Sequence, residues 1–189
     1  MRFVGVDPAT KTGVVILDID GKVLLETELK GKGKAVKGGI SIEQLVDLEN
    51  QLYTLLEPGD EIVIEQPAMG TQRGVTTGMI HGGLRSMVHR RSLTFNDINP
   101  MHTKRYVDNT GWTVENGKKR RYTATEKKKA VLAAVNERFG YTHKSDNVVD
   151  AYIIARAAVN LYRMREWMPL LDSSPNQKEV TEAILNKAL

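Results

Sequence analysis

The chain has 189 residues, a length that suits a single domain with a substantial hydrophobic core. It contains no cysteine, so disulfides and thiolate-bound zinc are excluded. Its formal net charge of +4 is compatible with a polyanionic partner but is too small to identify one. No apolar run approaches the roughly 20 residues of a membrane-spanning helix, and the first residues are typical of a strand rather than a signal peptide. We therefore expect a cytoplasmic protein that does not bind membranes.

The first half of the chain is predicted to be mainly β-structure. Alternating and β-branched residues predict three strands in an antiparallel meander, over residues 2–6, 13–18 and 23–29. Apolar residues at helical spacing predict a helix over 42–56, with Ser41 as its N-cap. A fourth strand is expected over Glu61–Glu65, directly after the helix-stopping Pro58-Gly59 pair.

The second half is predicted to be mainly helical. The expected helices cover residues 76–90, 101–109, 125–139, 146–164 and 179–189. A fifth strand is expected over 92–98, and the polar, basic segment 111–123 is expected to form a β-hairpin-like excursion. Residues 1–168 are expected to form one domain, and 169–189 a C-terminal extension with a short helix. This order of elements resembles the ribonuclease H-like fold, which implies an α/β protein with a five-stranded mixed sheet and helices on both faces.

Four acidic residues lie at the ends of apolar segments: Asp7, Glu65, Asp146 and Asp150. A carboxylate at the edge of a buried element costs free energy unless something compensates its charge. Asp146 and Asp150 are four residues apart and share one helix face, where like charges repel unless a cation lies nearby. Carboxylate oxygens are the ligands that Mg²⁺ prefers. The four acids therefore predict a site for Mg²⁺, with Mn²⁺ as the other possible ion.

Three of these acids lie in segments that resemble the motifs of RuvC-type Holliday-junction resolvases. Asp7 opens Asp-Pro-Ala-Thr-Lys-Thr-Gly, Glu65 precedes Gln-Pro, and Asp150 opens Asp-Ala-Tyr-Ile-Ile-Ala. The motifs follow the order in which the family has them. The family often places another acid three residues before its Asp-Ala pair, where this chain has Asn147 instead. Asn147 or His143 is therefore a candidate fourth contributor besides Asp146.

Basic and polar residues near these motifs are candidates to contact DNA. In the mechanism that the resemblance implies, Lys104 or Lys127 balances the negative charge of the transition state. The expected DNA-binding residues are Gln72, Arg73, Lys104, Lys118, Lys119, Arg120, Arg121, Lys127 and Lys128. Trp112 or Tyr122 is a candidate to stack on an unpaired base, and a solvated charged loop is the alternative for this basic segment. Along the helix over 76–90, His81 is expected to be structural and the arginines to form a solvated face.

The resemblance implies hydrolysis of DNA phosphodiesters with two Mg²⁺ ions about 3.5–4 Å apart. Asp7 would bridge the ions, with Glu65 on one side and Asp146 and Asp150 on the other. It also implies paired cuts in a four-way DNA junction by a homodimer. A nuclease of broader branched-DNA specificity and an inactive junction-binding protein stay open as alternatives. Sugar kinases and actin-like ATPases share the loop after Asp7, but they are not expected to place a glutamate at position 65 and would need a larger second domain.

Overall fold

The computed structural model describes residues 1–34, 36–37, 39–67, 74–109, 111–115 and 117–188. The strands among them are β1 (Phe3–Asp7), β2 (Lys11–Leu17), β3 (Val23–Lys30), β4 (Glu61–Glu65), β5 (Phe95–Ile98), β6 (Trp112–Glu115) and β7 (Lys118–Arg121). The helices are α1 (Ile42–Leu55), α2 (Gly74–Arg90), α3 (Pro100–Arg105), α4 (Ala124–Phe139), α5 (Asp146–Arg165) and α6 (Pro175–Ala188). The predicted order of elements is confirmed, including the hairpin. None of the described helices is long and apolar enough to cross a membrane.

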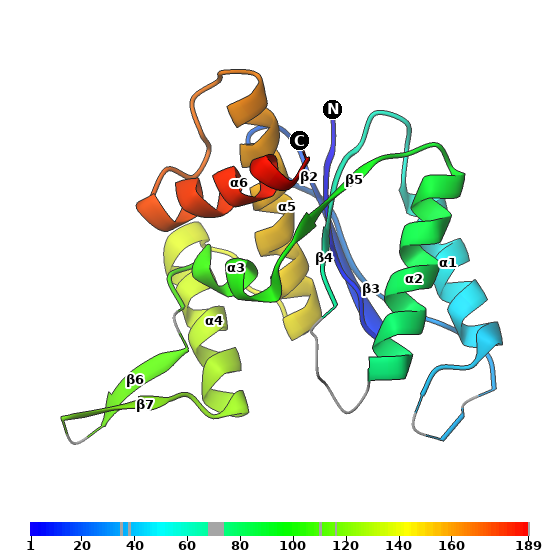
Figure 1. Cartoon of the computed structure of the whole chain (residues 1–189), viewed down its shortest axis with the longest axis horizontal. Helices are drawn as coiled ribbons and strands as arrows, with labels where there is room; N and C mark the ends of the chain where they lie inside the picture. The colour runs from blue at the N-terminus through cyan, green and yellow to red at the C-terminus, as the bar shows by residue number, and fades with distance from the viewer. Residues whose placement is uncertain (35, 38, 68–73, 110, 116, 189) are drawn as a thin grey trace.

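Five strands form one mixed sheet in the order β3-β2-β1-β4-β5 (Figure 1). β2 runs antiparallel to both β1 and β3, whereas β4 runs parallel to both β1 and β5. The parallel register pairs Gly5 with Val63 and Val6 with Ile64. The last residues of β1 and β4, Asp7 and Glu65, therefore lie side by side at the carboxyl ends of neighbouring strands.

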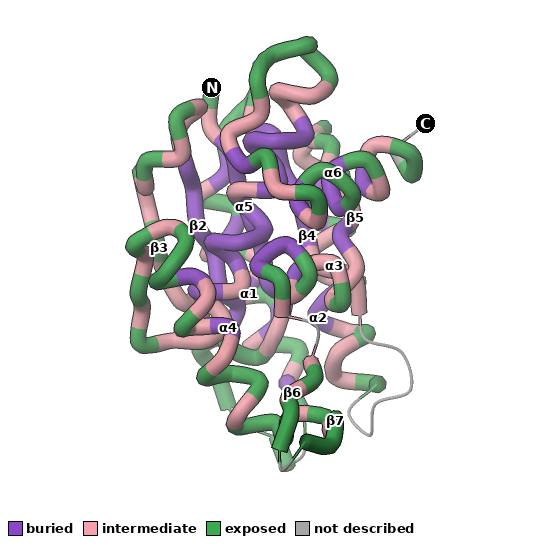
Figure 2. Tube along the Cα trace, turned by 90° about the vertical axis from the view of Figure 1, so that its left-hand side faces the viewer, coloured by how far each residue is buried: buried purple, intermediate pink, exposed green. Residues whose placement is uncertain are grey.

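Helices cover both faces of this sheet. On one face, Val4 of β1 belongs to a buried cluster with Leu48 of α1 and Leu84 of α2. On the other face, Phe3 of β1 and Val63 of β4 pack against the long helix α5, with α4 and α6 beyond it. Figure 2 shows the buried residues gathered along α5 and the central strands. The expected ribonuclease H-like arrangement, a five-stranded mixed sheet between two helical layers, is confirmed.

The helix α5 lies directly on the backbone of two neighbouring strands. A Cβ atom at Gly5 would come within 2.1 Å of the carbonyl oxygen of Ala151, and one at Gly13 within 2.0 Å of the carbonyl oxygen of Asn147. No side chain fits in either place, because protein interiors leave no free space on this scale. Gly5 shares one face of β1 with Asp7, and Gly13 is paired with Asp7 across the sheet. The two glycines thus bring the first turns of α5 close to Asp7.

Three expected boundaries are wrong, each at a local turn. β5 begins at Phe95 rather than at residue 92, because Ser92 adopts a left-handed φ of 56° in the turn after α2. α3 ends at Arg105 rather than at residue 109, because Asp108 adopts a φ of 58° and reverses the chain. α6 begins at Pro175 rather than at residue 179, since proline suits the first position of a helix, where its missing N–H is not needed.

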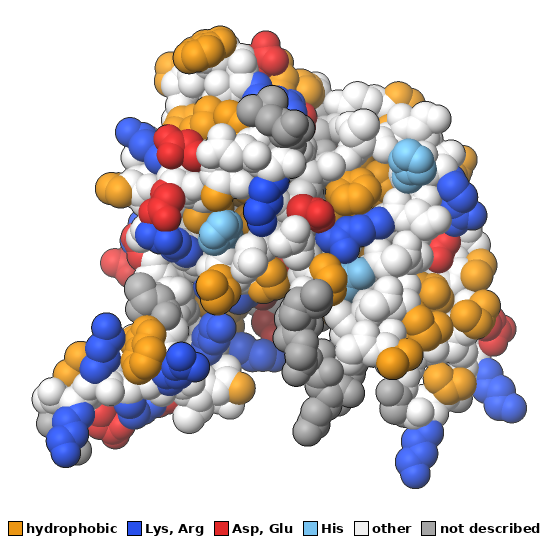
Figure 3. Space-filling model, in the orientation of Figure 1, with side chains coloured by type: hydrophobic (Ala, Val, Ile, Leu, Met, Phe, Trp, Pro, Cys, Tyr) orange, Lys and Arg blue, Asp and Glu red, His pale blue; other side chains and the backbone are white. Residues whose placement is uncertain are grey.

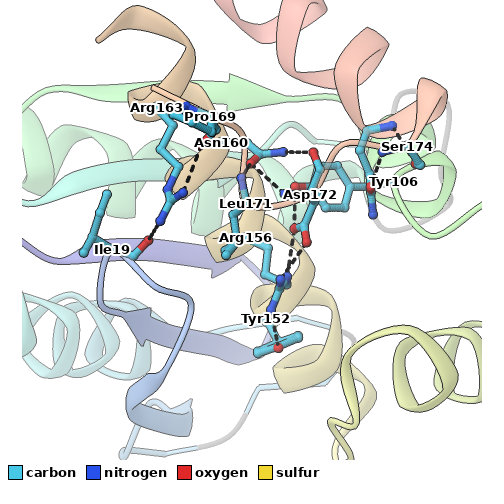
Figure 4. A network of polar contacts seen from close by, with 11 residues as sticks. Ile19, Tyr106, Tyr152, Arg156, Asn160, Arg163, Pro169, Leu171, Asp172 and Ser174 are labelled. Atoms are coloured by element: carbon cyan, nitrogen blue, oxygen red, sulfur yellow. Dashed lines mark hydrogen bonds and ion pairs between the residues drawn. The ribbon is translucent and has the colours of Figure 1, made fainter. Parts of the chain in front are cut away.

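The segment after α5 is held by buried polar groups around Asp172 (Figure 4). Arg156 of α5 donates two hydrogen bonds to the Asp172 carboxylate, at 2.8 and 2.6 Å, and the Tyr106 hydroxyl donates a third at 2.8 Å. The side chain of Asn160 accepts from the backbone N–H of Asp172 at 3.1 Å and donates to its carbonyl at 2.7 Å. α6 then packs Ile184 into the α5 side of the core. The C-terminal residues therefore share the core of the sheet.

We expect Asp172→Ala to lower the free energy of unfolding by about 3 kcal/mol, because it leaves the Arg156 guanidinium buried without its carboxylate. Urea unfolding at pH 7 measures this loss. Tyr106→Phe is the matched comparison, because it removes one hydrogen bond from the same carboxylate and is expected to cost about 1 kcal/mol. Equal losses in the two variants would contradict a dominant role for the ion pair.

Candidate functional site

Asp7 and Glu65 form the centre of the candidate site. Asp7 is the last residue of β1 and Glu65 the last of β4. Both lie two residues after a position that packs against α5, so their carboxyls are on the α5 face of the sheet. Asp7 is only 8% exposed, and the Glu65 carboxyl is close enough for its charge to act on Asp7. The structure therefore brings together two of the acids that the sequence predicts for the site.

The helices α5 and α3 complete this cluster. Asp150 lies in the second turn of α5, at the end of the helix that rests on β1 and β2. Its carboxylate forms an ion pair with the ammonium of Lys104 on α3. α3 begins directly after β5, where the Asn99 side chain caps it by accepting the backbone N–H of Met101 at 2.8 Å. With this cap α3 starts at the end of β5, and its residue Lys104 lies beside the carboxyls.

The cluster contains more negative than positive charge. Burial raises the pKa of Asp7 well above its usual range, and the charges of Glu65 and Asp150 raise it further. Burial also raises the pKa of Glu65, while the nearby Lys104 opposes that rise. Burial alone would lower the pKa of Lys104, but the surrounding carboxylates outweigh it and raise the pKa. One ammonium therefore compensates three buried or half-buried carboxyls, so the site favours an additional cation.

Two residues that the sequence interpretation missed hold Glu65 in place. Thr103 of α3 is fully buried and donates its hydroxyl to the Glu65 carboxylate at 2.9 Å. Arg85 of α2 donates to the backbone carbonyl of Glu65 at 3.0 Å and to the Asp97 carboxylate at 2.6 Å. The expected solvated face is therefore wrong for Arg85, which reaches across the ends of β4 and β5. A hydroxyl residue directly before Lys104 was the available signal for Thr103, whereas no local pattern indicated Arg85.

Asp146 lies beside the cluster, with the lysines of α4. It is the first residue of α5 and forms an ion pair with Lys128, which lowers the pKa of Asp146. A pocket of about 240 Å³ is lined by Asp146 and Asp150 together with Lys104, Lys127 and Lys128. The structure thus places both acids of α5 on one pocket. The role of Asp146 as a metal ligand stays a prediction.

The two candidate fourth contributors support the start of α5. The Asn147 amide donates to the backbone carbonyl of Lys11 at 2.8 Å, which ties α5 to β2. Nδ1 of His143 accepts the backbone N–H of Ser145 at 3.0 Å. These contacts use the amide nitrogen of Asn147 and one ring nitrogen of His143. A direct contribution of either residue to a metal site stays a prediction.

The predicted DNA-binding residues lie at several places around this site. Lys104 is in the cluster, Lys127 and Lys128 are near the start of α4, and the basic run 118–121 is the strand β7 of the projecting hairpin. Gln72 and Arg73 lie outside the described residues. The Arg120 guanidinium is paired with Glu115 and Glu126. Three of the expected phosphate contacts, Lys104, Arg120 and Lys128, therefore already have carboxylate partners.

The chemistry of the donor set fits Mg²⁺. Asp7, Glu65 and Asp150 supply hard oxygen donors from three different elements, in a cluster with more negative than positive charge. Within the described ranges, no three acidic or histidine side chains have the spacing of a preformed metal site. Lys104 instead provides the positive charge beside Asp150. The oxygen donors of these residues and the excess negative charge of the cluster therefore suit a divalent cation.

His81 is a buried neutral base that supports Arg85. Its Nδ1 lies 3.4 Å from Nη1 of Arg85, and since a guanidinium only donates hydrogen bonds, Nδ1 is the acceptor. Burial, followed by the positive charge of Arg85, lowers the pKa of His81 to about 4. The unfolded chain takes up a proton near pH 6.5, whereas the folded protein does not until about pH 4. His81 therefore makes the protein lose stability as the pH falls through this window.

We expect the wild-type protein to lose about 2 kcal/mol more unfolding free energy than His81→Gln when the pH is lowered through this window. Glutamine keeps an acceptor for Arg85 but does not titrate. Urea unfolding of both proteins at several pH values measures the difference, and the titration of other groups cancels in the comparison. Parallel pH dependences in the two proteins would show that His81 is not held neutral.

Comparison with known proteins supports the fold. No protein-family model and no curated protein matches this sequence. A solved structure described as "Thermus thermophilus RuvC structure" matches with a TM-score of 0.61 and 16% identity, over 89% of this chain and 98% of that one. A second, described as T. thermophilus RuvC in complex with Holliday junction substrate, has a TM-score of 0.61 and 14% identity, over 88% and 96% of the two chains. The chain thus has a RuvC-like fold over most of its length.

Proposed function

We propose that this protein is a metal-dependent endonuclease that resolves four-way DNA junctions by paired hydrolysis of phosphodiester bonds. The observation that carries this proposal is the meeting of Asp7, Glu65 and Asp150 with Lys104 in a RuvC-like fold. These acids come from the three segments whose motifs resemble RuvC resolvases. A similar solved structure is described as a complex with Holliday junction substrate, which supports the choice of substrate. We also propose that the protein acts inside the cell, in a cytoplasm that contains its DNA substrate.

Asp7, Glu65 and Asp150 would hold the metal, and we propose two Mg²⁺ ions with a contribution from Asp146. Mn²⁺ has the same preference for oxygen ligands and is the alternative ion. When bound, such ions lower the pKa of a water molecule and stabilise the charge that develops on the phosphate.

The chain's own residues prepare the site for this chemistry. The Thr103 hydroxyl fixes one oxygen of Glu65, so that the carboxylate does not rotate freely. Burial of Asp7 keeps bulk water away, which strengthens every electrostatic interaction in the cluster. Lys104 has a compact charge next to Asp150, and we propose that it stabilises the additional negative charge of the transition state.

We propose that the protein acts as a homodimer, because paired cuts need two active sites. An exposed face of α2 supports this: Gly74, Gly78 and Gly82 recur at every fourth residue, and a Cβ at any of them would meet no atom within 4 Å. Each glycine costs a helix about 1 kcal/mol relative to alanine, which close packing of a second copy offsets.

We expect Gly82→Arg to convert a wild-type dimer into a folded monomer, because the long charged side chain blocks close approach of α2 to its partner. Light scattering measures the mass, and far-UV circular dichroism checks the fold. A monomeric wild-type protein, or a variant that stays dimeric, would contradict an interface at this face of α2.

The function is tested by cleavage of a synthetic four-way DNA junction with labelled strands in the presence of Mg²⁺. We expect the wild-type protein to cut two strands of the junction and leave 5′-phosphate ends, and Glu65→Gln to be inactive. Glu137→Gln is the matched control, because Glu137 is an exposed acid on α4 and is expected to leave cleavage unchanged. Equal cleavage by the wild-type protein and Glu65→Gln would overturn the assignment.

Other substrates separate the two related functions. Comparable cleavage of flaps, forks and four-way junctions would indicate a nuclease of broader branched-DNA specificity. Tight junction binding without turnover at any Mg²⁺ or Mn²⁺ concentration would indicate an inactive junction-binding protein. A linear duplex of the same sequence serves as the unbranched control.

A further inference from the structure

The β6–β7 hairpin has one face that combines an aromatic ring with cations. Trp112 is paired with Arg121, and Val114 with Lys119. Residues directly opposite each other in an antiparallel pair project from the same side. The Arg121 guanidinium lies 5.0 Å and the Lys119 ammonium 5.4 Å from the centre of the Trp112 ring, which is 40% exposed in spite of its size. We call these residues, Trp112, Val114, Lys119 and Arg121, the tryptophan face.

The opposite face of the hairpin is neutralised and anchored. Arg120 donates to the Glu126 carboxylate through both terminal nitrogens, at 2.9 and 2.7 Å, and also pairs with Glu115. Glu126 in turn accepts the backbone N–H of Thr123 at 2.8 Å in the capping box of α4. Lys118 and Arg120 on this face are balanced in number by Glu115 and Glu126, whereas Lys119 and Arg121 have no carboxylate partner among the described residues. The uncompensated positive charge of the hairpin is therefore concentrated on the tryptophan face, which α4 holds in place.

The tryptophan face continues into a groove that reaches the carboxyl cluster. The groove has a volume of about 660 Å³ and lies between the hairpin and α3. Its walls include Trp112, Arg121, Tyr122, Lys127 and Lys104. Lys104 is the same residue that pairs with Asp150, and Lys127 also lines the pocket beside the two acids of α5. Figure 3 shows the projecting hairpin with cationic side chains around a hydrophobic group, below the body of the protein. The groove thus joins an exposed aromatic ring to the proposed site of hydrolysis.

We propose that this groove binds unpaired nucleotides of a DNA strand next to the phosphodiester that is cut, with a base stacked on Trp112 and the flanking phosphates beside Lys119, Arg121 and Lys127. The proposal rests on the proposed nuclease function and defines its substrate more closely. A base in a duplex is already stacked on both sides, so an exposed indole contacts it only after it has left the helix. An aromatic platform flanked by cations is the usual arrangement for single-stranded nucleic acid. The groove therefore favours junctions that have unpaired nucleotides beside the cleaved bond over fully paired duplex DNA.

Binding measurements without Mg²⁺ test the groove independently of cleavage. The chain contains two tryptophans, and Trp167 is 95% exposed, so Trp167→Phe leaves Trp112 as the only tryptophan reporter. We expect an oligothymidine of about 12 nucleotides to quench the Trp112 fluorescence as the base stacks on it. Trp112→Ala is expected to weaken binding of this oligonucleotide about tenfold, with less than about a twofold effect on a duplex. Trp112→Phe keeps a ring and is expected to restore most of the binding.

Two controls separate stacking from charge and from folding. Trp167→Ala removes an exposed tryptophan elsewhere, and Lys22→Ala removes an exposed cation from the turn between β2 and β3. Both are expected to leave oligothymidine binding within about twofold of the wild-type protein. An absence of quenching, or an equal loss of single-stranded and duplex binding in Trp112→Ala, would overturn the proposal. If Trp112 binds single strands but no junction is cleaved, only the nuclease function fails. If junctions are cleaved but Trp112 has no role, only the groove fails.

Discussion

Asp7→Asn is expected to reduce DNA cleavage by more than about 10³-fold, because Asp7 lies at the centre of the carboxyl cluster that would hold the metal. The loss of several kcal/mol of charge stabilisation by a metal corresponds to a rate change of this size. Initial rates on a labelled four-way junction at saturating Mg²⁺ measure the effect. Asp20→Asn is the matched control, because Asp20 is an exposed acid in the turn between β2 and β3 and its side chain is 82% exposed.

The same substitution is expected to stabilise the protein when no metal is present. The folded state raises the pKa of Asp7, chiefly through burial and then through Glu65 and Asp150. When folding raises the pKa of an acidic group, the folded protein becomes less stable as the pH rises above the pKa that the group has in the unfolded chain. Asparagine removes this ionisation, so the melting temperature is expected to increase, more at pH 8 than at pH 5.

Added Mg²⁺ is expected to reverse this order. A ligand that binds only the folded state raises the melting temperature, and the wild-type protein has the complete set of carboxylates. Asp7→Asn is expected to show little response to Mg²⁺, and Asp20→Asn to respond as the wild-type protein does. If Asp7→Asn cleaves at the wild-type rate, or responds to Mg²⁺ as strongly as the wild-type protein, Asp7 is not a metal ligand.

Gly13→Ala and Gly5→Ala are expected to have the largest effect on stability. A methyl group at either position would overlap a backbone carbonyl of α5, at 2.0 and 2.1 Å, and backbone does not move aside as a flexible side chain does. Overpacking of a core typically costs about 1–3 kcal/mol, and the direct contact with backbone places both variants at or above the upper end of this range. Urea unfolding followed by circular dichroism measures the loss.

A third glycine provides the control. A Cβ atom at Gly78, on the exposed face of α2, would meet no atom within 4 Å. Gly78→Ala is therefore expected to leave the unfolding free energy of the monomer unchanged or to raise it by about 1 kcal/mol through better helix propensity. Wild-type stability in Gly13→Ala would mean that α5 does not rest on the strand as the structure shows.

The sequence predicts the sheet well, because the signals that define its central strands are local. The run Glu61–Glu65 is apolar between two polar turns, and β4 has these bounds. The capping box of α1 at Ser41 is also visible as a local pattern and is present in the structure. The acids at the ends of β1 and β4 could be predicted to lie close together. These two strands are neighbours in the ribonuclease H-like fold that the sequence resembles.

The contacts that hold these acids in place could not be predicted from sequence. Thr103 and Arg85 reach Glu65 across 38 and 20 positions of the chain, and neither belongs to a repeated pattern. The network around Asp172 joins α5 to the segment before α6 through side chains that look like ordinary surface residues in the sequence. Such contacts depend on how the elements pack, which local propensity does not determine. The ion pair of Asp146 with Lys128 is a further example, since it joins two helices.

The backbone contact between α5 and the strands limits how this site can change during evolution. Asp7 and Asp150 are held by a strand and a helix that meet without side chains between them, so their Cα atoms have a spacing that repacking cannot adjust. A core filled by larger side chains offers many small substitutions that shift a helix by fractions of an ångström. Here only the length of the acidic side chain is free to vary, through exchange of aspartate for glutamate. A change of metal or of substrate geometry is therefore expected to arise through exchanges between these two residues, or through Lys104 on the separately anchored α3.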